Sequence, residues 1–78
     1  MADIKPSWTW EEEFDGGEAG CGDLLVRLKL FFDALPSGRL VLLRSLTGAA
    51  PVEIPSWCRL TGHTLMQAEH PYYLVRRK

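Results

Sequence analysis

Cys21 is the residue of this 78-residue chain whose type and position most favour covalent chemistry. It follows a glycine-rich segment, Asp15-Gly-Gly-Glu-Ala-Gly20, and precedes a stretch with helical periodicity. A thiol just before a helix lies at the positive end of the helix macrodipole, near backbone N–H groups that have no intrahelical partner. That setting lowers a thiol pKa and favours the nucleophilic thiolate. Cys21 is therefore our candidate catalytic residue, and Gly20 and Gly22 leave it little steric cover.

The residues after Cys21 also support a different interpretation. Glycine at position 22 costs roughly 0.5–1 kcal/mol of helical order relative to alanine. The charge of Asp23 stabilises a helix N-terminus, but a negative charge close to the sulfur raises a thiol pKa. The alternative is that Cys21 is an unreactive small residue at the start of a helix, as most free cysteines are inert.

The other potential ligands and nucleophiles have structural interpretations. Cys58 follows Trp57 inside a predicted helix and is expected to be a small core residue, and a Cys21–Cys58 disulfide would need α-carbons within about 7 Å. His63 and His70 are expected to be solvated turn residues. The two cysteines and two histidines form neither a Cys-x-x-Cys motif nor a histidine pair at helical spacing, so we predict no metal site. No catalytic triad, phosphate-binding loop or dinucleotide fingerprint is present, so we predict no cofactor.

Charge is distributed unevenly along the chain. Residues 1–23 contain seven acidic residues and one lysine, whereas residues 24–78 contain eight basic and three acidic residues. The second segment is expected to present a basic face, and its candidate partner-docking residues are Arg27, Arg59, Arg76 and Arg77. If these converge near Cys21, they would attract an acidic partner and favour the thiolate. No RNA-recognition signature is present, so we expect no direct binding of nucleic acid.

The clearest structural element is a helix over residues 23–35. Its apolar residues lie on one helical face, and Pro36-Ser37-Gly38 ends it. Residues 39–44 form a short apolar run typical of a central strand covered by helices. Upstream, the alternation of Trp8 and Trp10 with polar residues predicts a first strand over residues 8–14, with the tryptophans covering the core or an edge.

Downstream, Pro55 fits the first turn of a second helix that ends at Gly62. Residues 64–69 and 72–77 follow as two strands joined by a His70-Pro71 turn. The predicted fold is an α+β two-layer sandwich of order βαβαββ, with a four-stranded mixed sheet and two helices on one face. Residues 1–78 form one domain, expected to be monomeric, with residues 1–7 as a loose arm. We expect neither a signal peptide nor a membrane span, and two cysteines are typical of a reducing, cytoplasmic setting.

The element order and several motifs resemble the TusA/SirA family of small sulfur-carrier proteins. The motifs are Phe14-Asp15, the glycine-containing loop 16–20, Cys21, Pro36-Ser37-Gly38, Glu53-Ile54-Pro55-Ser56-Trp57, Gly62-His63-Thr64-Leu65 and Leu74-Val75-Arg76-Arg77-Lys78. The resemblance runs from about residue 8 to residue 78. Two positions depart from the family pattern: its Cys-Pro-x-Pro is Cys21-Gly22-Asp23-Leu24 here, and the acidic residue after the second strand is missing from Leu46-Thr47-Gly48.

The resemblance implies a sulfurtransferase that carries a persulfide on Cys21. The sulfur would come from a cysteine desulfurase or a rhodanese-type donor and pass to an acceptor protein, in a pathway such as tRNA thiolation or sulfur oxidation. The alternative is a non-catalytic protein-interaction module on the same scaffold that has lost sulfur transfer. It would dock through the basic C-terminal residues or through the surface of Trp8 and Trp10.

Overall fold

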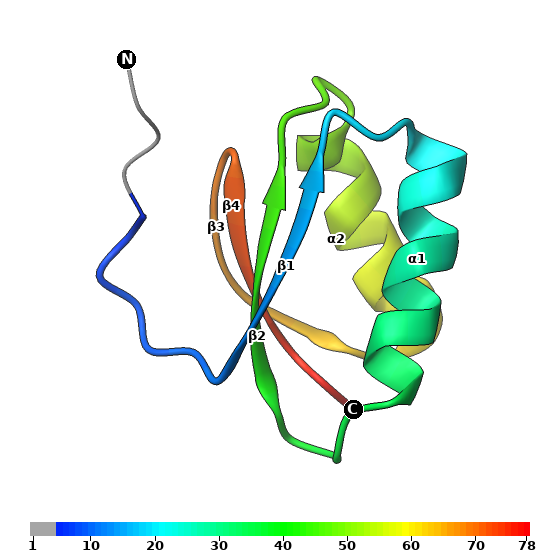
Figure 1. The fold of residues 1–78 in the computed structure, drawn as a ribbon. Helices are drawn as coiled ribbons and strands as arrows, with labels where there is room; N and C mark the ends of the chain where they lie inside the picture. The colour runs from blue at the N-terminus through cyan, green and yellow to red at the C-terminus, as the bar shows by residue number, and fades with distance from the viewer. Residues whose placement is uncertain (1–4) are drawn as a thin grey trace.

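The computed structural model of the protein describes residues 5–78, apart from the side chain of Cys21. Over these residues the elements are β1 (Glu12–Gly17), α1 (Cys21–Asp33), β2 (Leu40–Ser45), α2 (Ala50–Thr61), β3 (Thr64–Glu69) and β4 (Tyr72–Arg76). The strands form one sheet in the order β1-β2-β4-β3, in which β1 and β2 are parallel and the other pairs antiparallel. Both helices cover the same face of the sheet (Figure 1). The predicted βαβαββ sandwich is confirmed.

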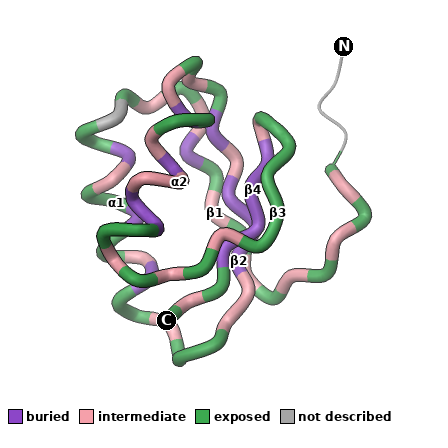
Figure 2. Tube along the Cα trace, turned by 180° about the vertical axis from the view of Figure 1, so that it is seen from behind, coloured by how far each residue is buried: buried purple, intermediate pink, exposed green. Residues whose placement is uncertain are grey.

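The core lies between the helices and the two central strands. Figure 2 shows buried positions along β2 and β4, and three residues of α1 spaced four apart project onto them. Aromatic contacts continue this packing, since the Phe32 ring centroid lies 5.1 Å from that of Trp57. The buried core residues are Leu24, Leu28, Phe32, Val41, Leu43, Ala50, Ile54, Trp57, Cys58, Tyr73 and Val75.

The first strand begins and ends later than the alternation of residues 8–14 predicts. β1 pairs with β2 from Glu12 opposite Val41 to Gly17 opposite Ser45. Because β2 begins only at Leu40, residues 8–10 have no neighbouring strand to pair with. The segment predicted as a glycine-rich loop therefore supplies the last three residues of β1, and Trp8 and Trp10 lie outside the sheet.

Residues 5–11 lie on the side of the sheet that carries no helix (Figure 1). Strand alternation directs Leu42 and Leu74 to this face, and both are buried although neither belongs to the core under the helices. The Glu13 carboxylate, on the same face, accepts hydrogen bonds from Lys5 Nζ at 2.8 Å and Trp10 Nε1 at 3.0 Å. The sequence predicts a loose arm over residues 1–7, of which residues 1–4 lie outside the described part of the chain. Lys5, in the same arm, forms an ion pair with Glu13 of β1.

Both helices begin earlier than predicted. α1 starts at Cys21 because the Leu24 N–H donates to the Gly20 carbonyl at 2.8 Å and closes a first turn ahead of the apolar stripe. α2 starts at Ala50 and includes Pro55, since burial of Ala50 and Ile54 favours a longer helix than the proline suggests. Gly62 ends α2 in the left-handed conformation, as predicted. None of the helices in residues 5–78 is long and apolar enough to cross a membrane.

Gly16 sets how closely α1 approaches the sheet. A β-carbon at this position would lie 2.5 Å from Leu24 Cδ1 and 3.3 Å from the Arg44 carbonyl oxygen. Leu24 belongs to the first turn of α1 and is buried, so it has little room to move. The absence of a side chain at position 16 therefore lets the N-terminal turn of α1 seat against β1.

We expect Gly16→Ala to lower the free energy of unfolding by about 1–3 kcal/mol, because the added methyl overpacks this contact. Gly22→Ala is the matched control: a β-carbon there meets nothing within 4 Å, and alanine is the better helix former, so stability rises by up to about 1 kcal/mol. Urea denaturation measures both variants. Equal stability of Gly16→Ala and the wild type would show that the contact does not constrain the helix.

Candidate functional site

The structure places Cys21 as the first residue of α1, one position further into the helix than predicted. The preceding residue, Gly20, is the N-cap, with an extended backbone (φ −67°, ψ 161°). No side-chain oxygen among the described residues caps this end of the helix. The first-turn N–H groups of a helix have no intrahelical acceptors, so this terminus retains donors for an anionic group. The side chain of Cys21 lies outside what the structure describes.

The glycines on either side of Cys21 lie in open surroundings. Gly20 and Gly22 are both exposed, and a β-carbon built on either one meets no atom within 4 Å. The chain therefore forms an accessible corner at the start of α1.

The end of the molecule around Cys21 is acidic. β1 and β2 run parallel, and each is followed by a helix, so the N-termini of α1 and α2 lie at the same end of the sandwich (Figure 1). Glu18, Asp23 and Glu53 all belong to segments at this end. Asp23 is paired with Arg27 at 3.1 Å, one turn along α1. The charge at this end opposes the effect of the helix dipole on a thiolate.

Asp15 is a further acid at this end, and Arg44 neutralises it. Arg44 Nη1 lies 2.9 Å from Asp15 Oδ1 across the parallel strands. This hydrogen bond, with a smaller contribution from the Gly17 N–H, lowers the pKa of the Asp15 carboxyl.

The four candidate docking arginines do not converge near Cys21. Arg27 is the middle residue of α1 and reaches back to Asp23, while Arg59 is exposed in the last turn of α2. Arg77 donates from Nε to the Phe32 carbonyl at 2.8 Å, which places it at the C-terminal end of α1. Phe32 follows Cys21 by eleven residues, or about 16 Å along a helix. Arg76 is the neighbour of Arg77, so the basic C-terminal segment lies at the end of the molecule opposite Cys21.

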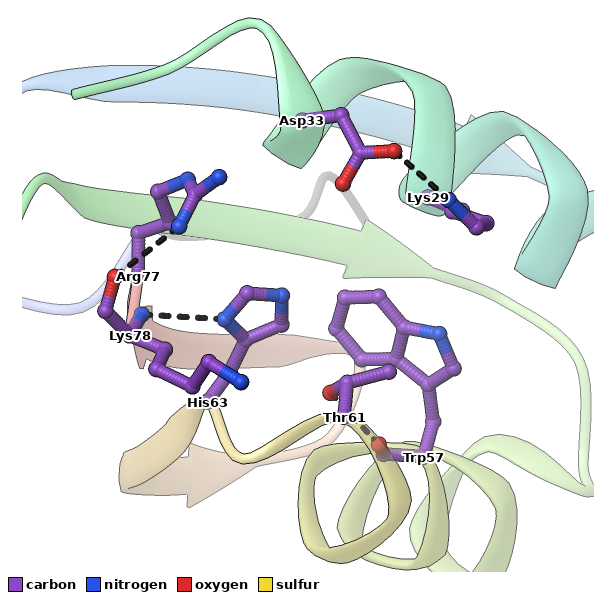
Figure 3. A pocket seen from close by; sticks show the side chains of 7 residues that line it. All are labelled: Lys29, Asp33, Trp57, Thr61, His63, Arg77 and Lys78. Atoms are coloured by element: carbon purple, nitrogen blue, oxygen red, sulfur yellow. Dashed lines mark hydrogen bonds and ion pairs between the residues drawn. The ribbon is translucent and has the colours of Figure 1, made fainter. Parts of the chain in front are cut away.

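At that opposite end the structure forms a cavity of about 310 Å³ (Figure 3). Its lining comes from the last turns of α1, the end of α2 and the residues after β4. The side chains are Lys29, Asp33, Trp57, Thr61, His63, Arg77 and Lys78. We did not predict this site, because its residues are scattered between positions 29 and 78. The sequence signal that points to it is the clustering of Arg76, Arg77 and Lys78 at the end of the last strand.

His63 lines this cavity. It lies in the connection between α2 and β3, as predicted, but it is half-buried against aromatic rings and not fully solvated. Its ring centroid lies 4.8 Å from that of Phe32 and 5.1 Å from that of Trp57. Its Nδ1 accepts a hydrogen bond from the Lys78 backbone N–H at 3.0 Å. Burial against these rings lowers the pKa of His63, and the charges of Arg77 and Lys78 lower it further. His70, by contrast, is exposed in its turn, with Nδ1 2.7 Å from the Tyr73 hydroxyl.

Cys58 is the core residue that its position predicted. It is 3% exposed and is a free thiol. Burial raises its pKa to about 11, so it is protonated at neutral pH. Cys58 is therefore unsuited to nucleophilic chemistry.

No protein-family model matches the chain, and no curated protein matches it either.

The lowered pKa of His63 predicts how stability depends on pH. In the unfolded chain this histidine titrates near 6.5, whereas the folded protein binds its proton only at lower pH. Below about pH 6.5 the unfolded state thus holds more protons, and stability is lost as the pH falls through the folded-state pKa. We expect His63→Asn, whose amide oxygen can replace Nδ1 as an acceptor, to lose less stability between pH 7.5 and pH 5 than the wild type. Urea denaturation at both pH values measures this, and identical losses would contradict it.

Proposed function

We propose that the protein is a sulfur carrier in which Cys21 holds a persulfide. The observation that carries this proposal is the position of Cys21 as the first residue of α1, behind an N-cap glycine and at an accessible corner. Backbone N–H groups at such a position favour a thiolate. The flanking glycines leave room for the thiol of a partner protein to approach.

Each half-reaction is a thiol–persulfide exchange. The Cys21 thiolate attacks the outer sulfur of a persulfide on the donor protein, and the donor's own thiolate leaves. The Cys21 persulfide then meets an acceptor thiolate, which bonds to its outer sulfur and releases the Cys21 thiolate. No electrons are gained or lost overall, so the carrier needs no redox cofactor. The inert Cys58 lies in the core and takes no part.

The resemblance to the TusA/SirA family supports the same activity and suggests the partners. A cysteine desulfurase or a rhodanese-type protein would be the donor in the cytoplasm, and a second protein would accept the sulfur. The resemblance rests in part on the βαβαββ order, which the sequence pattern predicts and the fold has. The carrier would act as a monomer that exchanges partners at the Cys21 corner.

A non-catalytic interaction module is the second candidate function. The observation that favours it is the separation of charge: acidic residues surround the Cys21 end, and Arg76 and Arg77 lie at the far end. A docking role through the basic end needs no reactive thiol. It would leave partner binding intact in Cys21→Ser.

The carrier is tested by intact-protein mass spectrometry after incubation with a cysteine desulfurase and cysteine. We expect the wild type and Cys58→Ala to gain the mass of one sulfur atom and Cys21→Ser to gain none. If none of several donor enzymes loads the wild type, or if Cys21→Ser is loaded as well, the carrier mechanism is wrong. A pull-down with the same variants then tests the docking module.

Asp23 is expected to tune the reactivity of Cys21. Removing its charge in Asp23→Asn should lower the Cys21 thiol pKa, whereas Arg27→Gln, which leaves Asp23 without its partner at 3.1 Å, should raise it. The pH dependence of iodoacetamide alkylation in a Cys58→Ala background reports this pKa. Equal pKa values in the two variants would show that this carboxylate does not act on the thiol.

A further inference from the structure

We infer that the cavity between the C-terminal ends of α1 and α2 binds a small phosphate dianion, either free phosphate or a phosphate monoester. The cavity is lined by Lys29, Asp33, Trp57, Thr61, His63, Arg77 and Lys78 (Figure 3). It lies at the opposite end of the molecule from Cys21, and the inference does not depend on sulfur transfer.

The charge of the lining matches a dianion. Asp33 is paired with Lys29 at 2.7 Å, so these two side chains neutralise each other. Arg77 and Lys78 remain, and no acidic side chain among the described residues pairs with either of them. The lining side chains therefore carry three positive charges against the one negative charge of Asp33, and a main-chain oxygen of Lys78, the last residue of the sequence, lies 2.9 Å from Arg77 Nη1. Cationic N–H groups bind phosphate through short, charge-assisted hydrogen bonds.

Arg77 is held in place by the backbone. Its Nε donates to the Phe32 carbonyl at 2.8 Å, and its Nη1 donates to a main-chain oxygen of Lys78 at 2.9 Å. These bonds fix the plane of the guanidinium and leave Nη2 with no partner among the described residues. The bond to Phe32 also covers a carbonyl at the end of α1 that would otherwise repel an anion. Arg77 thus makes the end of a helix compatible with a negative ligand.

His63 supplies a neutral donor to the same space. Because Nδ1 accepts the hydrogen bond from the Lys78 N–H, the neutral ring carries its proton on Nε2. Figure 3 shows this second nitrogen directed away from the Lys78 amide, toward the space between Asp33, Arg77 and Trp57. The rings of Phe32 and Trp57 pack against the imidazole and hold its orientation.

An adjoining cavity of about 480 Å³ gives an ester group room. It shares Arg77 and Lys78 with the first cavity and adds Arg76 as a third cation. Two of its lining residues, Gly38 and Gly62, have positive φ and no side chain to block the opening. A β-carbon at Gly62 would lie 2.8 Å from Lys78 Cδ, so this glycine also accommodates the lysine side chain.

The test is an NMR titration of the full-length, 15N-labelled protein with inorganic phosphate at constant ionic strength set by chloride. We expect saturable shifts at the His63 ring and at the Arg77 and Lys78 amides. Saturation should also raise the His63 pKa, because the bound anion offsets the charges of Arg77 and Lys78, while Lys29 and Asp33 remain paired. Ethyl phosphate is titrated in parallel, and its affinity relative to phosphate distinguishes an ester site from a free-phosphate site.

Lys78→Gln should weaken phosphate binding about tenfold, as expected for the loss of one charged hydrogen bond. Its backbone bond to His63 is retained, so the variant keeps its fold. Arg27→Gln, in the middle of α1 and outside the cavity lining, and Cys21→Ser should bind like the wild type. The inference is overturned if chloride alone reproduces the shifts, if acetate binds as tightly as phosphate, or if Lys78→Gln binds unchanged.

Discussion

The parallel pairing of β1 with β2 is the constraint on which the rest of the structure depends. Parallel neighbours require a crossover, and α1 provides it over one face of the sheet. The pairing brings the carboxyl ends of both strands to one edge, so α1 and α2 start at the same end and finish at the other. Cys21 is thereby placed at the start of a helix, and Phe32 and Thr61 near the helix ends where the basic residues gather.

The same topology converts a charge gradient along the sequence into a charge gradient along the molecule. The acidic segment before residue 24 supplies β1 and the first turn of α1, so Glu18 and Asp23 remain near Cys21. β4 runs antiparallel to β2 and delivers the chain back to the opposite end, where Arg76, Arg77 and Lys78 follow it. A partner that approaches Cys21 therefore meets a surface of different charge from one that approaches the C-terminal residues.

The sequence was sufficient to predict the elements whose signals are local. The apolar periodicity of α1 and the glycine that ends α2 each depend on neighbouring residues, and both predictions are confirmed. The limits of β1 could not be predicted, because a strand extends only where its partner runs alongside it. The environment of His63 was missed for a related reason. Its contacts are with Phe32, Trp57 and Lys78, which come from three separate segments, and no spacing in the sequence connects them.

The two ends of α1 belong to one rigidly packed helix, but charges at one end act only weakly on the other. Leu24, Leu28 and Phe32 are all at most 2% exposed, so the helix is fixed to the sheet along its length. The Cys21 backbone and the Phe32 carbonyl lie about 16 Å apart along a helix, which exceeds the Debye length of about 8 Å at physiological salt. A charge bound beside Arg77 is thus largely screened from Cys21. The proposed sulfur transfer at one end and the inferred anion site at the other can therefore be altered independently, and any coupling between them must pass through movement of α1 rather than through its charges.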